Sequence, residues 1–168
     1  MFKHNDYKVR DEYYTQAKDV EILVPFLKPG AKVWCPFDKA ESNYVKVLRK
    51  HGFIVEHTHI DDGGDFFVEI EKERDCDYII SNPPYSLKTP IFEALFKKGV
   101  PFAMFCHEQG MFEGPRFKIF SNYEFEILWP RWRAKFDSCY FTRSTSPPFH
   151  TNYYCHKVLP KQLIFVGG

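Results

Sequence analysis

The chain has 168 residues, a length typical of one domain with a sizeable core. Its formal net charge is only +1, which excludes the strong global basic field of a nonspecific nucleic-acid binder. Aromatic residues make up 18% of the sequence, a share that suits core packing and also suits a protein that stacks bases. Composition therefore predicts a single domain over 1–168, in which any contact with nucleic acid comes from a local patch, or in which the substrate is small.

The five cysteines are odd in number and widely spaced, and no Cys-x-x-Cys pair occurs. The sequence also shows no signal-peptide pattern and no long apolar segment. These features predict a cytoplasmic protein that makes no contact with a membrane. His57 and His59 would point the same way on a strand, but no further ligands have suitable spacing, so we expect no metal site.

In the first half of the chain, the pattern alternates between helix and strand. Apolar spacing predicts a helix over 12–27, ended by Pro29 and Gly30. A strand at 33–35, a helix over 41–49 and a second strand at 53–59 follow it. Gly63 and Gly64 then predict a turn into 65–67.

The second half continues the alternation. An apolar run at 77–80 predicts a buried parallel strand, and a helix over 89–96 follows, with Thr89 as N-cap and Pro90 at the first helical position. Further strands are predicted at 101–106 and 124–129, whereas 130–150 carries little periodicity. Segments 152–158 and 163–166 predict a C-terminal antiparallel hairpin. The whole pattern predicts an α/β fold, a mainly parallel sheet with helices on both faces.

The loop Ser81-Asn82-Pro83-Pro84-Tyr85-Ser86 is the most informative stretch, because loops after parallel strands are where α/β proteins bind ligands. An aromatic amine is a poor nucleophile, since its lone pair is delocalised into the ring. The side-chain carbonyl of Asn82 and the backbone carbonyl of Pro83 could accept hydrogen bonds from both its N–H groups and pull the nitrogen toward tetrahedral geometry. Two prolines stiffen the loop, and Tyr85 offers a stacking face. The same residues could also form only a rigid turn.

The segment Asn82-Pro83-Pro84-Tyr85 resembles the Asn/Asp-Pro-Pro-Tyr/Phe motif of S-adenosylmethionine-dependent amino-methyltransferases, especially the N6-adenine enzymes. Other segments occur in that family's order. Residues 11–16 resemble its Tyr/Phe-Thr-Pro cofactor segment, 33–38 its first-strand segment, and 64–67 the Asp-Phe segment that lies against the cofactor adenine. The whole chain also looks like small adenine-methyltransferase-like proteins carried by bacteriophages and mobile elements.

The resemblance implies a Rossmann-like class I methyltransferase fold. It also implies methyl transfer from S-adenosylmethionine to an exocyclic amino group, above all adenine N6 in DNA or RNA. Its catalytic residues would be Asn82, Pro83, Pro84 and Tyr85. The residues that it assigns to the cofactor are Tyr14, Thr15, Cys35, Pro36, Phe37, Asp38, Asp65 and Phe66.

The sequence departs from the family pattern at the first strand. Cys35 stands where the family has an acidic residue, and 38–40 replaces the glycines that let the backbone approach the cofactor. The carboxylate for the ribose stays open among Glu56, Asp61 and Asp62. Two alternatives also stay open: a catalytically inactive binding protein on a methyltransferase fold, and a methyltransferase acting on protein glutamine or guanine N2.

A stretch from Trp129 to Phe136 interleaves basic and aromatic side chains, the composition of a nucleic-acid contact. We interpret 129–150 as a candidate substrate-recognition loop, although a solvated loop anchored by tryptophans would have the same composition. Arg116 and Arg143 could extend the basic surface, and His107 is a further candidate pocket residue. The candidate substrate-binding residues are Tyr85, Ser86, Arg131, Trp132, Arg133 and Lys135.

Overall fold

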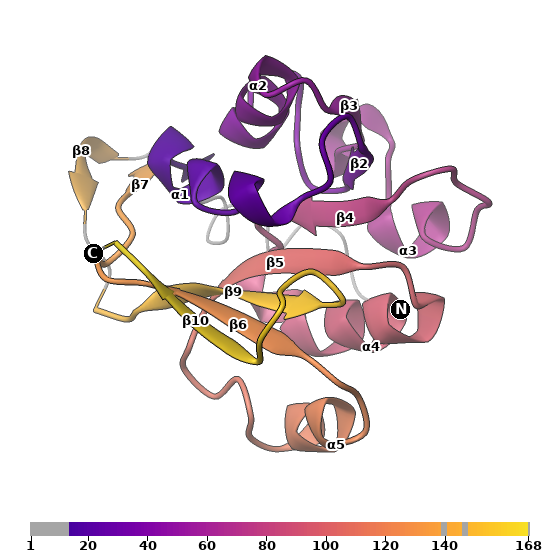
Figure 1. Ribbon diagram of the computed structural model, residues 1–168, viewed down its shortest axis with the longest axis vertical. Helices are drawn as coiled ribbons and strands as arrows, with labels where there is room; N and C mark the ends of the chain where they lie inside the picture. Colours follow the sequence, from indigo (N-terminus) through magenta and orange to yellow (C-terminus); the bar gives the residue numbers. More distant parts are fainter. Residues whose placement is uncertain (1–13, 139–140, 146–147, 168) are drawn as a thin grey trace.

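The computed structural model describes residues 14–138, 141–145 and 148–167. A seven-stranded sheet forms its centre, with the strand order β10-β6-β9-β5-β4-β2-β3 (Figure 1). In chain order its strands are β2 (Lys32–Cys35), β3 (Ile54–His57), β4 (Tyr78–Ser81), β5 (Phe102–His107), β6 (Glu126–Pro130), β9 (Thr151–His156) and β10 (Leu163–Val166). Residues 11–13 of the first cofactor segment lie outside the described residues.

Six of these seven strands run in one direction. β2 pairs in parallel with β3 and with β4, and β4 pairs in parallel with β5. β9 is antiparallel to both β5 and β6, and β10 is parallel to β6. The chain leaves β2 outward to β3 and then returns to β4 on the other side of β2, which makes β2/β4 the switch point of the sheet. The expected α/β, Rossmann-like fold with a mainly parallel sheet is confirmed.

The predicted C-terminal hairpin is wrong. β9 has the expected antiparallel direction, but it lies between β5 and β6, and β10 pairs with the far side of β6. Burial explains the difference. All six residues of β9 are buried, so this strand needs a neighbour on each side, whereas β10 alternates between exposed and half-buried positions and suits an edge.

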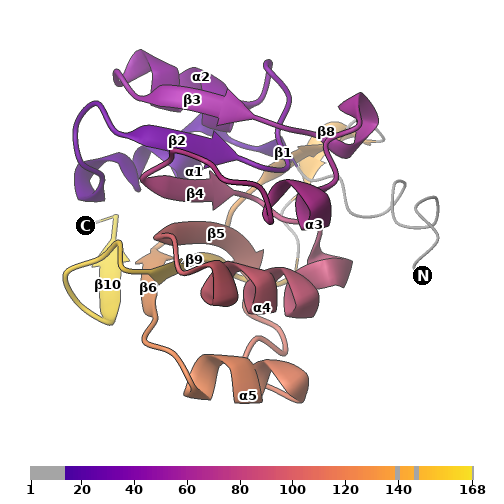
Figure 2. The ribbon, with the colours of Figure 1, turned by 90° about the vertical axis from the view of Figure 1, so that its right-hand side faces the viewer.

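Two hydrophobic clusters cover the two faces of the sheet. β5 shows the division, since Ala103 and Phe105 face one cluster while Phe102, Met104 and Cys106 face the other. The helices that pack onto the first face are α1 (Ala17–Glu21) and α2 (Asn43–Lys50). Those on the second face are α3 (Phe66–Glu69), α4 (Lys88–Lys98) and α5 (Pro115–Ser121). In Figure 2, α4 runs across the near side of the strands, and the expectation of helices on both faces is confirmed.

Two predicted helices differ in their bounds. The helix expected over 12–27 is a short α1 that ends at Glu21, followed by the 3-10 turn η1 (Val24–Phe26). Pro25 explains this break, because its ring would clash with the carbonyl of Glu21 four residues earlier. α4 begins at Lys88 with Leu87 as N-cap, so Thr89 is not its cap. The Thr89 hydroxyl instead accepts a hydrogen bond from Arg116.

Segment 130–150 forms structure that its lack of periodicity did not predict. β7 (Phe136–Ser138) pairs with β8 (Phe141–Thr145) and with β1 (Tyr14–Thr15), which gives a small antiparallel sheet in the order β1-β7-β8. The register places Thr15 opposite Phe136. The first cofactor segment and the candidate recognition loop are therefore joined by backbone hydrogen bonds. Across the described residues, we find no helix that is long and apolar enough to cross a membrane.

We expect Phe92→Ala to lower the free energy of unfolding by about 3–5 kcal/mol, because it opens a cavity in the second cluster. Phe92 is 0% exposed, and its ring centroid lies 5.1 Å from that of Phe120 and 6.0 Å from that of Phe102. Denaturant unfolding measures the loss. Phe117→Ala is the matched control, since Phe117 is 61% exposed, and we expect it to change stability by less than about 0.5 kcal/mol. Equal losses in both variants would contradict this account of the core.

Candidate active site

The switch point brings the two main motif segments together. Cys35 ends β2 and residues 36–38 follow it, residues 82–85 follow β4, and the two strands are neighbours in the sheet. Both segments therefore leave the same carboxyl edge side by side. This edge is where open α/β sheets bind their ligands.

Asp38 is a buried carboxylate at this edge, with 8% of its surface exposed. Its backbone N–H donates to the carbonyl of Thr58 at 3.1 Å, and the hydroxyl of Ser81 donates to its Oδ2 at 2.5 Å. Burial raises the pKa of Asp38 to about 6, and hydrogen bonds from the Ser81 and Ser42 hydroxyls oppose that rise. In the described part of the chain, no lysine, arginine or histidine forms an ion pair with Asp38.

Thr15 connects the N-terminal segment to the Pro-Pro loop. Its buried hydroxyl accepts a hydrogen bond from Nδ2 of Asn82 at 3.1 Å, and its backbone carbonyl accepts one from Nδ2 of Asn43 at 2.8 Å. The first of these bonds orients the Asn82 amide, because it assigns Nδ2 as the donor end and Oδ1 as the acceptor end. Segments 67 residues apart in the sequence are thus coupled at one side chain.

Tyr85 lies inside an aromatic cluster and is only 8% exposed. Its ring centroid is 4.6 Å from that of His107 and 6.2 Å from that of Phe149, both in edge-on geometry, and His107 and Phe149 are 4.7 Å apart. The 3-10 turn η3 (Tyr85–Leu87) follows directly, and Ser86 is exposed. A flat base could stack on the Tyr85 ring only after Phe149 moves away from it.

The remaining cofactor candidates differ in exposure. Cys35 is fully buried, which raises the pKa of its thiol well above the usual range. Phe37 packs on Phe66 at 5.0 Å, and Phe66 is buried and stacked on Trp34 at 6.0 Å. Pro36 is buried as well, whereas Tyr14 is exposed beside Thr15. The structure therefore places Phe66 within the second hydrophobic cluster.

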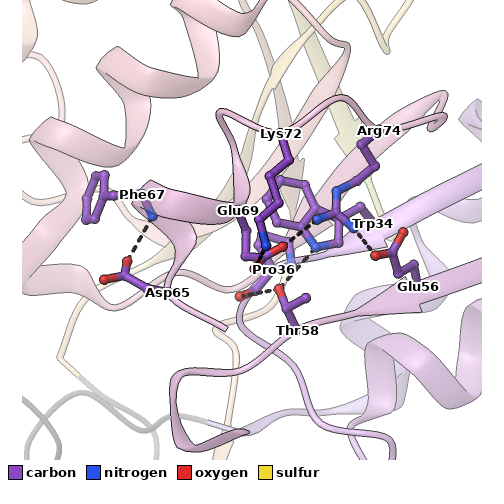
Figure 3. A network of polar contacts seen from close by, with 9 residues as sticks. All are labelled: Trp34, Pro36, Glu56, Thr58, Asp65, Phe67, Glu69, Lys72 and Arg74. Carbon is purple, nitrogen blue, oxygen red and sulfur yellow. Dashed lines mark hydrogen bonds and ion pairs between the residues drawn. The ribbon is translucent and has the colours of Figure 1, made fainter. Parts of the chain in front are cut away.

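Asp65 begins α3. Its side chain accepts a hydrogen bond from the backbone N–H of Phe67 at 3.0 Å, which caps the helix (Figure 3). Carboxylates suit this position because the first N–H groups of a helix have no partner within it. The carboxylate of Asp65 thus has a clear structural task as well as the role that the resemblance implies.

The three candidate ribose carboxylates lie in different surroundings. Glu56 pairs with Arg74, whose guanidinium lies 4.2 Å from the Trp34 ring centroid and also pairs with Glu69 at 2.8 Å (Figure 3). Asp61 pairs with Lys39 at 2.9 Å, and Asp62 is exposed beside it in η2 (Ile60–Asp62). Lys39 follows Asp38 directly, so its ion pair with Asp61 places Asp61 next to the segment that leaves β2. Glu56 instead pairs with Arg74, which lies over the Trp34 ring.

The basic stretch after β6 is anchored by its tryptophans. Nε1 of Trp132 donates to Oδ1 of the buried Asp19 at 2.7 Å, and Nζ of Lys18 lies 5.3 Å from the centroid of the Trp132 ring. Burial, the main cause, raises the pKa of Asp19. Trp129 stacks on His150 at 4.7 Å. The exposed residues are Arg131, Arg133 and Lys135.

The basic side chains of this stretch are therefore displayed, while the Trp132 indole is held against α1. Arg143 lies on β8, and its side chain is outside the described ones. No group of three or more histidine, cysteine, aspartate or glutamate side chains that could hold a metal ion occurs in 14–138, 141–145 and 148–167.

Sequence reasoning missed several residues of the site. Ser42 and Ser81 bond to Asp38, Asn43 positions Thr15, and Lys88 is a buried cation beside His107. A signal existed for Ser42, because a serine directly before an apolar-periodic run is a helix N-cap, and its side chain does accept from the N–H of Val45. Nothing in the sequence pattern marked Lys88.

Neither a scan against protein-family models nor a search of the curated proteins finds a match to this sequence. Among solved structures, the chain is similar to a precorrin-6y C5,15-methyltransferase from Geobacter metallireducens GS-15. The TM-score is 0.49 at 9% sequence identity, and the match covers 87% of this chain and 94% of the other. This likeness is one of overall chain course, and it assigns no role to any residue of this chain.

We expect Asp38→Asn to remove a pH dependence of folding stability. The folded pKa of about 6 exceeds the usual value of 3.8, so the fold favours the protonated carboxyl. The resulting stabilisation is complete below the unfolded pKa of 3.8 and is lost as the pH rises through 6, a change of about 3 kcal/mol. Denaturant unfolding from acid to neutral pH should show the wild type losing stability relative to Asp38→Asn. Parallel pH profiles for the two proteins would contradict the buried carboxylate.

Proposed function

We propose that this protein transfers a methyl group from S-adenosylmethionine to an exocyclic amino group, and that the acceptor is adenine N6 in DNA or RNA. One observation carries the proposal. Asp38, a buried carboxylate that pairs with no cation among the described residues, lies beside an oriented amide, Asn82, at the switch point of the sheet. The Asp38 carboxylate suits a cationic methyl donor, and the Asn82 amide suits a planar amine.

The residues after β2 fit the cofactor. An ionised carboxylate that is buried without a cation is costly, and the hydroxyl groups of Ser81 and Ser42 offset part of that cost. The α-ammonium group of S-adenosylmethionine would supply the missing charge. Lys39, which replaces a glycine of the family pattern, pairs with Asp61 at 2.9 Å. The edge of β2 is thus compatible with an amino-acid portion bound against Asp38.

When bound, the cofactor would supply an electrophilic methyl group on a positively charged sulfur. The protein's task is then mainly to orient the acceptor amine toward that methyl group. Holding two reactants in the correct geometry accounts for much of the rate enhancement of a group transfer. Oδ1 of Asn82 and the backbone carbonyl of Pro83 would accept the two N–H bonds of the amine. The nitrogen held by these two oxygens would take up the methyl group, the donor would leave as a neutral thioether, and the surplus proton of the nitrogen would pass to water.

The substrate would enter against Tyr85. A base in a duplex must first leave its stack to reach such a loop. The rings of Phe149 and Tyr85 contact each other edge-on, with centroids 6.2 Å apart, so the base would take the place of the Phe149 side chain. The exposed Arg131, Arg133 and Lys135 would contact the phosphates nearby.

We expect S-adenosylmethionine to bind the wild type and to bind more weakly as the pH falls. Below about pH 6 the carboxyl of Asp38 is protonated, so affinity should fall about tenfold for each further pH unit. Asp38→Asn should weaken binding at pH 8 by roughly ten- to a hundredfold, the effect of one lost charged hydrogen bond, and its affinity should no longer depend on pH in this range.

Isothermal titration calorimetry measures these affinities. Asp75→Asn is the control, because the Asp75 side chain is 85% exposed and pairs with Lys32 at the opposite edge of the sheet. No heat of binding to the wild type would favour the alternative of a binding protein that has lost the cofactor. Unchanged affinity in Asp38→Asn would contradict the role given to this carboxylate.

We expect Asn82→Ala to abolish methylation while it changes cofactor affinity less than about threefold, because the role proposed for Oδ1 of Asn82 is to hold the acceptor amine, and its Nδ2 bonds to the Thr15 hydroxyl. Asn82→Asp keeps an acceptor oxygen and should retain part of the activity. Asn122→Ala on the surface is the control. Mass spectrometry of nucleosides from a host expressing each variant measures the product. Full activity in Asn82→Ala would overturn the proposal, and methylated guanine or protein glutamine would favour the other acceptors that this loop could hold.

A further inference from the structure

Lys88 is a buried cation at the carboxyl edge of the sheet. It is the first residue of α4 and only 4% exposed. Its Nζ lies 3.3 Å from both ring nitrogens of His107 and donates to the backbone carbonyl of Gln109 at 3.1 Å. No carboxylate pairs with Lys88 in the described part of the chain. Burial lowers the pKa of Lys88 to about 8.

Arg116 adds a second cation to the same place. Its Nε and Nη2 donate to the carbonyl of Gly110 at 2.9 and 2.5 Å, and its Nη1 donates to the hydroxyl of Thr89 at 2.8 Å. The charge of Arg116 also contributes to the lowered pKa of Lys88 and of His107, whose pKa falls to about 4 chiefly through burial. Arg116 likewise has no carboxylate partner among the residues described.

In the part of the chain that the structure describes, these two neighbouring cations contact the neutral His107 ring and carbonyl and hydroxyl oxygens, and neither pairs with a carboxylate. Their positive charges repel each other. The carbonyls at 109 and 110 provide hydrogen bonds but no full negative charge. A bound anion would relieve both the repulsion and the desolvation. Phosphate suits this pair because the Arg fork and the Lys ammonium are the two side-chain groups that proteins use to bind it.

The two cations adjoin the loop that would hold the amine. His107, which contacts Lys88, packs against Tyr85 with ring centroids 4.6 Å apart. Lys88 itself is three residues beyond Tyr85 in the chain. The cations therefore lie one side chain away from the ring on which a base would stack, a spacing that suits the phosphate attached to the same nucleotide.

We infer that Lys88 and Arg116 form a phosphate site for the nucleotide whose base enters the Pro-Pro loop. This inference rests on the proposed function and narrows its substrate to a phosphorylated nucleotide unit of a nucleic acid. A protein glutamine has no phosphate, so this site distinguishes the two classes of acceptor.

The test compares the affinities of deoxyadenosine 5′-monophosphate and deoxyadenosine for the full chain without cofactor, measured by NMR titration. We expect the monophosphate to bind the wild type at least about tenfold more tightly, the effect of one charge-assisted hydrogen bond. Lys88→Gln and Arg116→Gln should each reduce this ratio to less than about threefold. Lys118→Gln is the matched control, since Lys118 is an exposed cation on the same helix as Arg116, and the ratio should not change.

A purely structural role for the two cations gives a different result. In that case the melting temperature of Lys88→Gln and Arg116→Gln falls, but the affinity ratio stays at the wild-type value, and the inference is overturned. Equal affinity of the wild type for the two probes, or no binding of either at millimolar concentration, overturns it as well. Because Arg116 is only half buried, Arg116→Gln remains informative even if Lys88→Gln does not fold.

A third probe, a short single-stranded oligonucleotide containing adenine, identifies the source of the phosphate. Tighter binding of the oligonucleotide than of the monophosphate supports a nucleic-acid substrate, and weaker binding overturns that part of the inference. Methyl transfer is measured separately with S-adenosylmethionine. Loss of the proposed activity with an intact phosphate preference, or the reverse, therefore shows which of the two statements fails.

Discussion

The candidate site depends on a buried carboxylate, Asp38, for which residues 14–138, 141–145 and 148–167 provide no ion-pair partner. Asp38 follows β2 and accepts hydrogen bonds from hydroxyls on two other elements, Ser81 at the end of β4 and Ser42 at the N-terminus of α2. These bonds make the ionised form tolerable, but only an external cation would make it favourable. The protein thus keeps a destabilising group at the switch point of its sheet, which is typical of binding sites rather than of cores.

The surrounding frame explains how such a group can be held. The parallel strands β2, β4 and β5 are buried on both faces by two separate clusters, so their carboxyl ends are fixed relative to one another. β9 extends this rigid region because it is buried along its whole length between β5 and β6. The strand ends and the loops after them are then free to carry polar residues, including His107 at the end of β5, Asn82 after β4, and the basic stretch that follows β6.

Negative and positive side chains lie at different places along this carboxyl edge of the sheet, an arrangement that would favour one orientation of donor and acceptor. The negative group, Asp38, lies after β2, whereas the cations Lys88 and Arg116 lie on the helices that follow β4 and β5. A cationic donor and an anionic acceptor would therefore be attracted to different strand ends of this edge. The aromatic cluster of Tyr85, His107 and Phe149 belongs to the end with the cations, because His107 contacts Lys88.

The sequence by itself determined the alternation of helices and strands and the parallel sheet, because these follow from local periodicity and from the punctuation by Gly and Pro. It also marked the loop at 81–86, whose prolines fix its backbone locally. Only the tertiary structure decided that β9 inserts between β5 and β6, that Thr15 bonds to Asn82, and that Ser81 bonds to Asp38. Each of these joins residues far apart in the chain, and a local pattern carries no record of such contacts. Lys88 shows most clearly what the sequence could not reveal. A lysine in the first turn of a helix is ordinarily solvated, and only the contacts of Lys88 with His107 and the Gln109 carbonyl show that it is a buried charge.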